Sequence, residues 1–417
     1  MELFLLKAFA FLRPLLSIEV EQRIAGTSLF DLVGIAFIAV LGMAFCIRIA
    51  LGEKQVTWRS LDAWIILYMV WCVAVAVIYP DKTDFRVLIK WVVPFGTYVV
   101  AAKIIRDPRD YLRLLSLLWA GHIVPILGSV VVVFLNLDLA IRKVVGATNL
   151  PKYEGLYADS GTFGLGMALF VMLGVVYAEV NRSYFGEDGK IGRAKITIFV
   201  FVTALALYCL LQSQSRTAQL GLVIFFAVYL YQISKKWLLI GAASLALFVA
   251  IMSPLLTLMY YDVIRVEEGE RPLEYVASRR PIFWQHNLSE FSNVSPDRWI
   301  AGAGIGNLVP MGELVRGREN FWSSHNDFLS VLIHTGIVGL LIFLVLQFVI
   351  LTKILSLERG VKAAFVALFI TVTIMNFASN SYVTRFALAQ MYFLVLSYLE
   401  FAKTRYATNS KAGLATA

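Results

Sequence analysis

The chain has 417 residues, of which 59% are apolar, and its mean hydropathy is +0.75. Soluble globular domains are about 45 to 50% apolar, so this composition excludes an ordinary soluble protein and predicts a polytopic membrane protein. Apolar runs long enough to cross a bilayer, about 20 residues each, recur along the whole chain, so residues 1–417 are expected to form a single membrane domain. The net charge of +9 is compatible with nucleic-acid binding, but basic residues in membrane proteins first report orientation.

The first apolar segment, Met1 to Leu16, carries Lys7, Arg13 and Pro14 and shows no small-residue cleavage site. We interpret it as a retained first span or surface helix, not as a signal peptide. The chain is therefore predicted to be all-α, with about 12 transmembrane helices and one large outer loop, 259–324, that contains short helices. The other spans are expected at Leu29 to Leu51, Ala63 to Tyr79, Val87 to Ile105, Leu114 to Leu135, Thr162 to Ala178, Ile196 to Leu211, Ala218 to Ile233, Leu238 to Leu258, Phe328 to Leu351, Ala363 to Phe377 and Phe386 to Phe401.

Most lysines fall in alternate connections between these spans, which become cytoplasmic if the N-terminus is cytoplasmic. The positive-inside rule favours this orientation over its inverse, and it explains most of the net charge without a nucleic-acid partner. The basic residues placed inside are Lys54, Arg59, Lys103, Arg106, Arg109, Arg113, Arg182, Lys190, Arg193, Lys195, Lys235, Lys236, Lys353, Arg359, Lys362, Lys403 and Arg405.

The three cysteines, Cys46, Cys72 and Cys209, all lie inside apolar runs and form no C-x-x-C pair. We interpret them as packing residues, with no disulfide framework and no zinc site.

The large outer loop holds seven arginines and nine acidic residues but no lysine. Its aromatic residues predict that it packs or lies on the membrane surface, with one helix over roughly Leu273 to Phe291 and a glycine-rich turn at Gly302 to Gly306. Arginine's planar fork grips phosphate oxygens two at a time, so the loop suits a lipid-linked phosphate or pyrophosphate. The alternative is that the arginines form exposed ion pairs within the loop, each contributing ~0 to 1 kcal/mol. The arginines are Arg265, Arg271, Arg279, Arg280, Arg298, Arg316 and Arg318, and the adjacent pair Arg279 and Arg280 is the strongest candidate.

Arg216 lies in a polar island, Gln212 to Gln219, between two apolar spans on the same outer side as the large loop. A charge near membrane depth is costly and by default indicates a functional site. The alternative is an arginine in a tight hairpin that extends its charge to the surface.

His325 stands where the large loop ends and an apolar helix begins. An imidazole with an ordinary pKa near 6.5 is mostly neutral at neutral pH and can accept a proton from a hydroxyl. The alternative is an interfacial histidine at a helix start, where Asn326 or Asp327 supplies the capping oxygen. We expect His122, His286 and His334 to be structural.

Outer arginines that hold a lipid pyrophosphate, together with a base for a sugar hydroxyl, describe a glycosyl transfer. Pyrophosphate leaves readily once its charge is neutralised, so neither ATP nor a metal is required, and no cofactor is expected. The sequence contains no D-x-D signature, which argues against the metal-dependent membrane oligosaccharyl transferases.

The sequence resembles the bacterial O-antigen ligase and Wzy-type O-antigen polymerase superfamily. The resemblance rests on Ser323-Ser324-His325-Asn326-Asp327-Phe328-Leu329 followed by Thr335-Gly336-Ile337-Val338-Gly339-Leu340, on Ser278-Arg279-Arg280-Pro281, on Ala301 to Asn307, and on Ser213-Gln214-Ser215-Arg216. It covers about the C-terminal half. Many relatives carry an acidic residue where His334 stands and a G-x-x-x-N-P-N-like stretch where this chain has Gly155 to Thr162.

The resemblance implies a metal-independent, inverting transfer with His325 as the general base. Arg216 and Arg279 or Arg280 would bind undecaprenyl pyrophosphate, with Ser215 and Asn326 in support. It also implies a multi-pass protein of the bacterial inner membrane with its site on the periplasmic side. The expected partners are the undecaprenyl-pyrophosphate-linked glycan donor, a glycan or lipid A-core acceptor, the lipid bilayer and, as a further candidate, a chain-length regulator.

A repeat-unit polymerase is the leading interpretation, and an O-antigen ligase that transfers the glycan to lipid A-core is close behind. A transporter or flippase of the lipid-linked oligosaccharide belongs to a different class. Transporters favour paired broken helices and repeated halves, whereas the polar residues here are concentrated in one asymmetric loop, which favours an enzyme. A non-catalytic assembly scaffold would tolerate the loss of His325 and Arg216.

Overall fold

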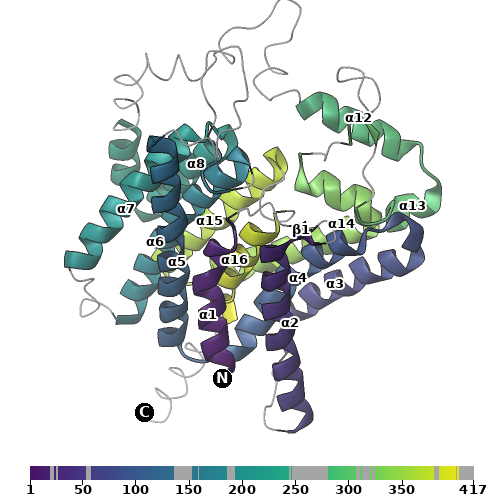
Figure 1. Cartoon of the computed structure of the whole chain (residues 1–417), viewed down its shortest axis with the longest axis horizontal. Helices are drawn as coiled ribbons and strands as arrows, with labels where there is room; N and C mark the ends of the chain where they lie inside the picture. Colours follow the sequence, from purple (N-terminus) through teal and green to yellow (C-terminus); the bar gives the residue numbers. More distant parts are fainter. Residues whose placement is uncertain are drawn as a thin grey trace, which may run out of the picture.

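The computed structural model of the chain describes residues 1–18, 23–24, 27–52, 58–135, 153–157, 159–185, 193–243, 246, 280–306, 310–311, 320–321, 325–379, 385–400 and 402. Within these residues the structure consists of helices, joined by short turns and two pairs of very short strands (Figure 1). The helices are α1 (Glu2–Leu15), α2 (Leu29–Ala50), α3 (Ser60–Ile78), η1 (Pro80–Lys82), α4 (Phe85–Ile104), α5 (Pro108–Phe134), α6 (Ser160–Phe185), α7 (Arg193–Gln212), α8 (Arg216–Ile233), α12 (Arg280–Ser292), α13 (Pro296–Ala301), α14 (Asp327–Leu355), α15 (Arg359–Ala378) and α16 (Phe386–Leu396). The strands β1 (Arg23–Ile24) and β2 (Thr27–Ser28) pair antiparallel, as do β3 (Pro310–Met311) and β4 (Asn320–Phe321).

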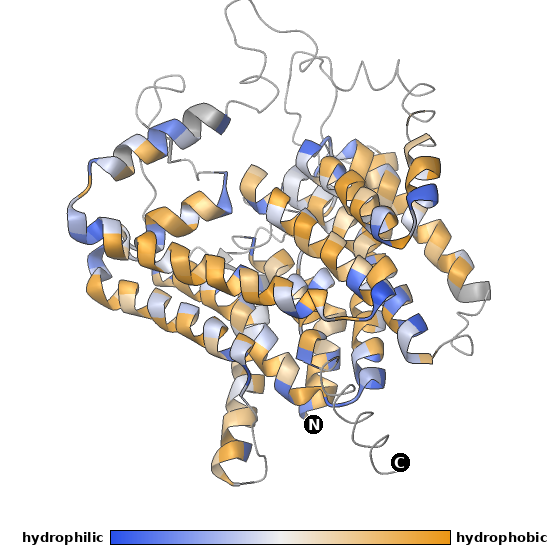
Figure 2. Cartoon of the chain, turned by 180° about the vertical axis from the view of Figure 1, so that it is seen from behind, coloured by the Kyte–Doolittle hydropathy of each residue, from blue (hydrophilic) through white to orange (hydrophobic). Residues whose placement is uncertain are grey.

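Eight helices in the described part of the chain are long and apolar enough to cross a membrane, namely α2, α3, α4, α5, α6, α8, α14 and α15. Two shorter apolar helices, α7 and α16, lie at predicted spans as well. Figure 2 shows apolar residues along these helices and hydrophilic residues gathered toward their ends. The protein is therefore an all-α polytopic membrane protein, as the composition predicts. Most of the predicted span Leu238 to Leu258 lies outside the described residues, and α16 ends at Leu396 and not at Phe401.

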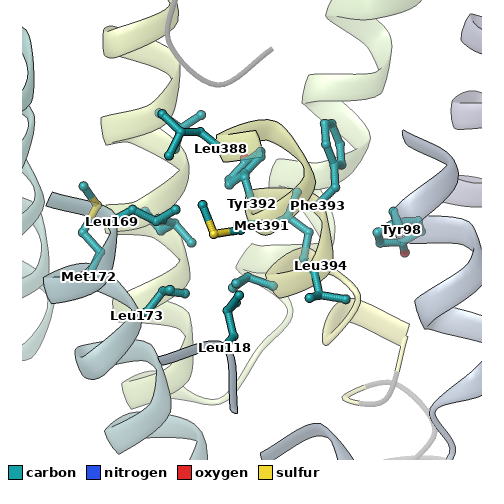
Figure 3. Close-up of a cluster of buried hydrophobic side chains, with 14 of the residues drawn as sticks. Tyr98, Leu118, Leu169, Met172, Leu173, Leu388, Met391, Tyr392, Phe393 and Leu394 are labelled. Atoms are coloured by element: carbon teal, nitrogen blue, oxygen red, sulfur yellow. The ribbon is translucent and has the colours of Figure 1, made fainter. Parts of the chain in front are cut away.

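The last helix, α16, lies at the centre of the bundle. Ten of its eleven residues are buried, and Figure 3 shows its side chains between those of α4, α5 and α6, which contribute Tyr98, Leu118 and Leu169. In a membrane the association of helices depends on close packing and polar contacts, since lipid tails are as apolar as leucine. This packing fixes where α16 begins, and the residue at its N-cap is Arg385.

A buried arginine in the first helix holds the same end of α16. The Arg13 side chain is 0% exposed, its Nε donates a hydrogen bond to Gln390 Oε1 at 2.6 Å, and its guanidinium lies 5.2 Å from the ring centroid of Phe386. Asp31 lies 3.7 Å from the same guanidinium and also pairs with Lys90. The segment Met1 to Leu16 thus contributes a packed helix of the bundle, with Arg13 as a cross-link.

The other end of the bundle carries its own ion-pair cluster around Glu400. Lys353 and Arg59 pair with the Glu400 carboxylate at 2.9 and 3.0 Å, and the Tyr98 hydroxyl donates to it at 2.9 Å. Lys103 pairs with the buried Asp62 at 2.5 Å. These basic residues belong to the set that the positive-inside rule assigns to the cytoplasmic side.

All three cysteines are free thiols. Cys72 and Cys209 are buried, in agreement with a packing role, but Cys46 is exposed. Its assignment as a packing residue is wrong, because an apolar span of this bundle carries one face that lies outside the packed core.

The described part of the large loop packs on the first half of α14. Phe291 at the end of α12 is buried with Leu329 and Ile333 of α14, and Figure 1 shows α12 and α13 beside that helix. The predicted helix of roughly Leu273 to Phe291 corresponds to α12, which ends at Ser292; residues 271–279 lie outside the described part.

The predicted glycine-rich turn is confirmed, and it fits into a break in α14. Gly302, Gly304 and Gly306 all have positive φ, and Ala303 N–H donates to the Ile333 carbonyl at 2.8 Å. At this level α14 departs from helical geometry at Gly336, with φ 68° and ψ −173°. Asp84 N–H donates to the Ile305 carbonyl at 2.8 Å, so the turn also joins the start of α4.

Replacing Gly336 with Ala is expected to destabilise the protein. Its φ and ψ are almost restricted to glycine, at a cost of about 1 to 3 kcal/mol for another residue, and a Cβ there would lie 2.2 Å from the Ile300 carbonyl oxygen. Thermal unfolding of the purified protein should show a clearly lowered midpoint. The matched control is Gly42→Ala in α2, where the nearest atom to an added Cβ is 3.9 Å away; equal midpoints for both variants would contradict the expectation.

Candidate active site

The N-termini of five helices converge at the end of the bundle opposite the Glu400 cluster. Asp159 precedes α6, Arg216 begins α8, Arg280 begins α12, His325 precedes the N-cap of α14, and Arg385 is the N-cap of α16. Each helix N-terminus carries a partial positive charge of about half an elementary charge, and its first N–H groups have no partner within the helix. The site is therefore positive both from its side chains and from its backbone.

Arg385 and Asp159 join α16 to α6. Arg385 Nη1 donates to both carboxylate oxygens of Asp159 at 3.0 Å and also to the Thr162 hydroxyl. The same carboxylate caps α6, because it accepts hydrogen bonds from the Thr162 N–H at 2.8 Å and the Thr162 hydroxyl at 2.6 Å. Burial acts to raise the pKa of Asp159, but Arg385 and Thr162 outweigh it, so that pKa lies below its ordinary value.

Arg280 joins the loop helix α12 to two spans. Its Nη1 donates to the Thr217 hydroxyl on α8 at 3.3 Å and to the Ala378 carbonyl at the end of α15. Burial, followed by the charges of Arg216 and Arg385, lowers the pKa of Arg280. Three guanidinium groups from distant parts of the sequence thus lie close enough to repel one another, an arrangement that an anion would stabilise.

A compact turn places Arg216. The Ser213 hydroxyl donates to the Leu210 carbonyl at 2.7 Å and accepts from the Ser215 N–H at 3.2 Å. Gly164 of α6 lies against this turn, since an added Cβ would stand 2.6 Å from the Cβ of Ser215. Ser215 is the N-cap of α8 but its side chain makes no capping hydrogen bond. Its predicted supporting role consequently rests on the turn and on contact with α6.

Asn326 positions His325 at the start of α14. The Asn326 side chain accepts a hydrogen bond from the Leu329 N–H at 3.0 Å and so caps the helix, which satisfies one of its free N–H groups. The capping oxygen expected from Asn326 or Asp327 is thus that of Asn326. His325 itself is half-buried and lies just outside the helix.

Burial and the neighbouring arginines together determine the protonation state of His325. Burial is the largest cause, and the charges of Arg280 and Arg385 add to it, so that the pKa of His325 falls from 6.5 to about 4, while Asp159 acts in the opposite direction. The imidazole is consequently neutral at neutral pH and able to accept a proton.

Backbone strain also gathers at this site. Among the described residues, Gln214 and His325 are the two non-glycine residues with positive φ, at 50° and 49°. Left-handed backbone costs roughly 1 kcal/mol or more for such residues. One of them lies in the turn before Arg216 and the other is the candidate base, and strained residues tend to cluster at functional sites.

The structure brings together most of the predicted site residues, namely His325, Arg216, Arg280, Asn326 and Ser215. Arg279 lies outside the described residues. Arg298 lies elsewhere, 6.0 Å from the ring centroid of Tyr79. His122 and His334 make hydrogen bonds to the backbone carbonyls of Leu118 and Gly304, as expected of structural histidines.

Sequence reasoning missed Arg385 and Asp159. The signal for Arg385 was present, since it is an isolated arginine in a short outer connection directly before an apolar span, as Arg216 is. Asp159 had no comparable signal, because a single aspartate before a span is a common helix cap. Within the described residues, no group of three or more histidines, cysteines and carboxylates is placed to hold a metal ion.

Residues 201–344 match the Wzy_C family model, which is described as O-antigen ligase. The matched segment contains Ser215, Arg216, Arg280, His325 and Asn326, whereas Asp159 and Arg385 lie outside it. No curated protein matches the chain in sequence.

Removing one arginine charge is expected to raise the pKa of His325. In Arg280→Gln a positive neighbour that disfavours the imidazolium is lost, so the titration of His325 should move up from about 4 toward 6.5. NMR of imidazole-labelled protein, with His325→Asn used to assign the signal, measures this. Arg298→Gln is the control and should leave the titration where it is; an unchanged titration in Arg280→Gln would show that the charge of Arg280 does not lower the pKa of His325.

Proposed function

We propose that this chain, whose residues 201–344 match the O-antigen ligase family model, transfers a glycan from undecaprenyl pyrophosphate to a sugar hydroxyl in surface polysaccharide assembly. The observation that carries the proposal is the convergence of Arg216, Arg280 and Arg385 with a neutral His325 at five helix N-termini. The acceptor is proposed to be a growing repeat-unit chain, as in a polymerase, and the alternative is lipid A-core, as in a ligase. The site is proposed to face the periplasm, opposite the basic cluster around Glu400.

In the proposed reaction His325 accepts the proton of the acceptor hydroxyl while the hydroxyl oxygen attacks the anomeric carbon of the donor sugar. The bond from that carbon to the pyrophosphate oxygen breaks, and its electron pair leaves with the undecaprenyl pyrophosphate. A single displacement of this kind inverts the anomeric configuration. The proton ends on the imidazole, whose release of it to water completes the cycle.

The guanidinium groups would carry most of the catalytic effect. Negative charge grows on the leaving pyrophosphate in the transition state, and donors already oriented toward that charge stabilise it without reorganisation. Arg216 and Arg280 are half-buried, where attraction to an anion exceeds that at a surface. The reaction as proposed takes no cofactor and no metal ion.

The arginine charges would also make the basicity of His325 depend on whether the donor is bound. Burial, followed by the charges of Arg280 and Arg385, holds the pKa of His325 down, which leaves a neutral but weak base. A bound pyrophosphate offsets those charges and should raise the pKa, which strengthens the base. Deprotonation of the acceptor would then follow donor binding.

We expect inorganic pyrophosphate to raise the pKa of His325 above about 4. The sign follows from the charges, because an anion between the arginines and the imidazole favours the protonated ring. The measurement is the NMR titration of His325 with and without saturating pyrophosphate, with chloride at matched ionic strength as the control. A pKa that stays the same or falls while pyrophosphate is bound would contradict the proposed geometry.

Replacing His325 with Ala in the native host is expected to abolish transfer and to change the surface glycans on a gel. Loss of a ligase should leave bare core while long chains accumulate on the lipid carrier. Loss of a polymerase should instead leave core capped by one repeat unit. His286→Ala is the matched control, a histidine of α12 that has no part in the proposed reaction, and its glycans should be normal.

Normal glycans from a well-expressed His325→Ala protein would remove the proposed base and favour a scaffold role. Failure of export, with unmodified lipid-linked units accumulating inside, would favour a transporter.

A further inference from the structure

An apolar groove of about 780 Å³ runs down the bundle between α7, α8 and residues 238–242. Its α8 wall includes Gln219, Val223, Ala227 and Leu230, and nearly all of its other lining is apolar. From Gln219 to Leu230 the wall extends about 16 Å along the helix. The groove therefore lies within the apolar part of the bundle and not at its polar surface.

The groove begins beneath the candidate active site. Arg216, Val223, Ala227 and Leu230 are separated by seven, four and three residues, a spacing that places them on one face of a helix. Side chains on a helix lean toward its N-terminus, so Arg216 stands at the outer end of the face that lines the groove.

The few polar groups near the groove mouth are placed to leave its wall apolar. The Gln219 side-chain amide donates to the Leu210 carbonyl at 3.2 Å, so this polar end is used within the protein. Arg216 in turn acts electrostatically on Arg280, which acts on His325. Helix α8 thus carries both Arg216, at its first position, and a wall of the apolar groove, which begins at Gln219.

We propose that this groove holds the first isoprene units of the polyprenyl tail of the donor, with the pyrophosphate at Arg216 and Arg280. The occupant follows from the charge and shape of the two parts, because an anionic head at the mouth and a long hydrocarbon in the groove describe one amphiphile. This inference rests on the proposed function and adds to it the path of the lipid. A second apolar groove of about 320 Å³, lined by Trp119 and Phe199, lies between α5, α6 and α7 and receives no residue from α8, the helix that Arg216 begins.

Binding of two probes to the full-length protein in nanodiscs tests the proposal. Undecaprenyl pyrophosphate carries head and tail, and inorganic pyrophosphate carries the head alone. Ala227→Trp fills the groove and is expected to weaken undecaprenyl pyrophosphate by about tenfold or more, since several buried methylene groups lose contact, with inorganic pyrophosphate unaffected. Arg216→Ala should weaken both probes.

The matched control is Ala39→Trp, which introduces the same side chain at an exposed position in the middle of α2 and should bind both probes as the wild type does. Val223→Trp is a second groove variant in case Ala227→Trp does not fold. If both groove variants bind undecaprenyl pyrophosphate as Ala39→Trp does, the tail of the donor does not lie in this groove. In that case this inference fails and the proposed function stands. If the wild type binds neither probe, the proposed function fails as well.

Discussion

The structure depends on the concentration of positive charge at one point, where five helix N-termini meet three arginines from separate parts of the chain. Like charges in a partly buried site repel strongly, and Asp159 offsets only part of this charge through Arg385. An anion bound among the three arginines would reduce this repulsion, and in the proposed function that anion is the pyrophosphate of the donor.

The rest of the fold fixes the positions of these helix N-termini relative to one another. Burial of α16 on nearly all sides fixes the position of Arg385, and Arg13 ties that end of the helix to α1 and α2. The break at Gly336 admits the glycine-rich turn, which draws the loop helices α12 and α13 onto α14. These contacts hold Arg280 at the start of α12 on one side of the site, and His325 lies directly before the N-cap of α14.

In the proposed function the apolar groove binds the hydrocarbon tail of the donor within the membrane. A lipid-linked substrate has a charged head and a hydrocarbon tail, and an enzyme for it needs a polar site that opens sideways into the bilayer. Helix α8 supplies both parts, since its first residue is an arginine and the same face continues as apolar wall. In the proposed complex the pyrophosphate would offset the cost of keeping Arg216 near membrane depth.

The sequence by itself determined the helical class and the positions of most spans in the described part of the chain, together with the residue types at their ends. Spans are visible because each must be apolar over its whole length, and Arg216, Arg280 and His325 are visible because charged or titratable groups are costly there. Only the tertiary structure decided that Arg385 and Asp159 join them, that Arg298 does not, and that the α8 face lines a groove. The physical reason is that hydropathy reports the surroundings of one segment at a time, whereas a site made of helix ends depends on how separate segments pack.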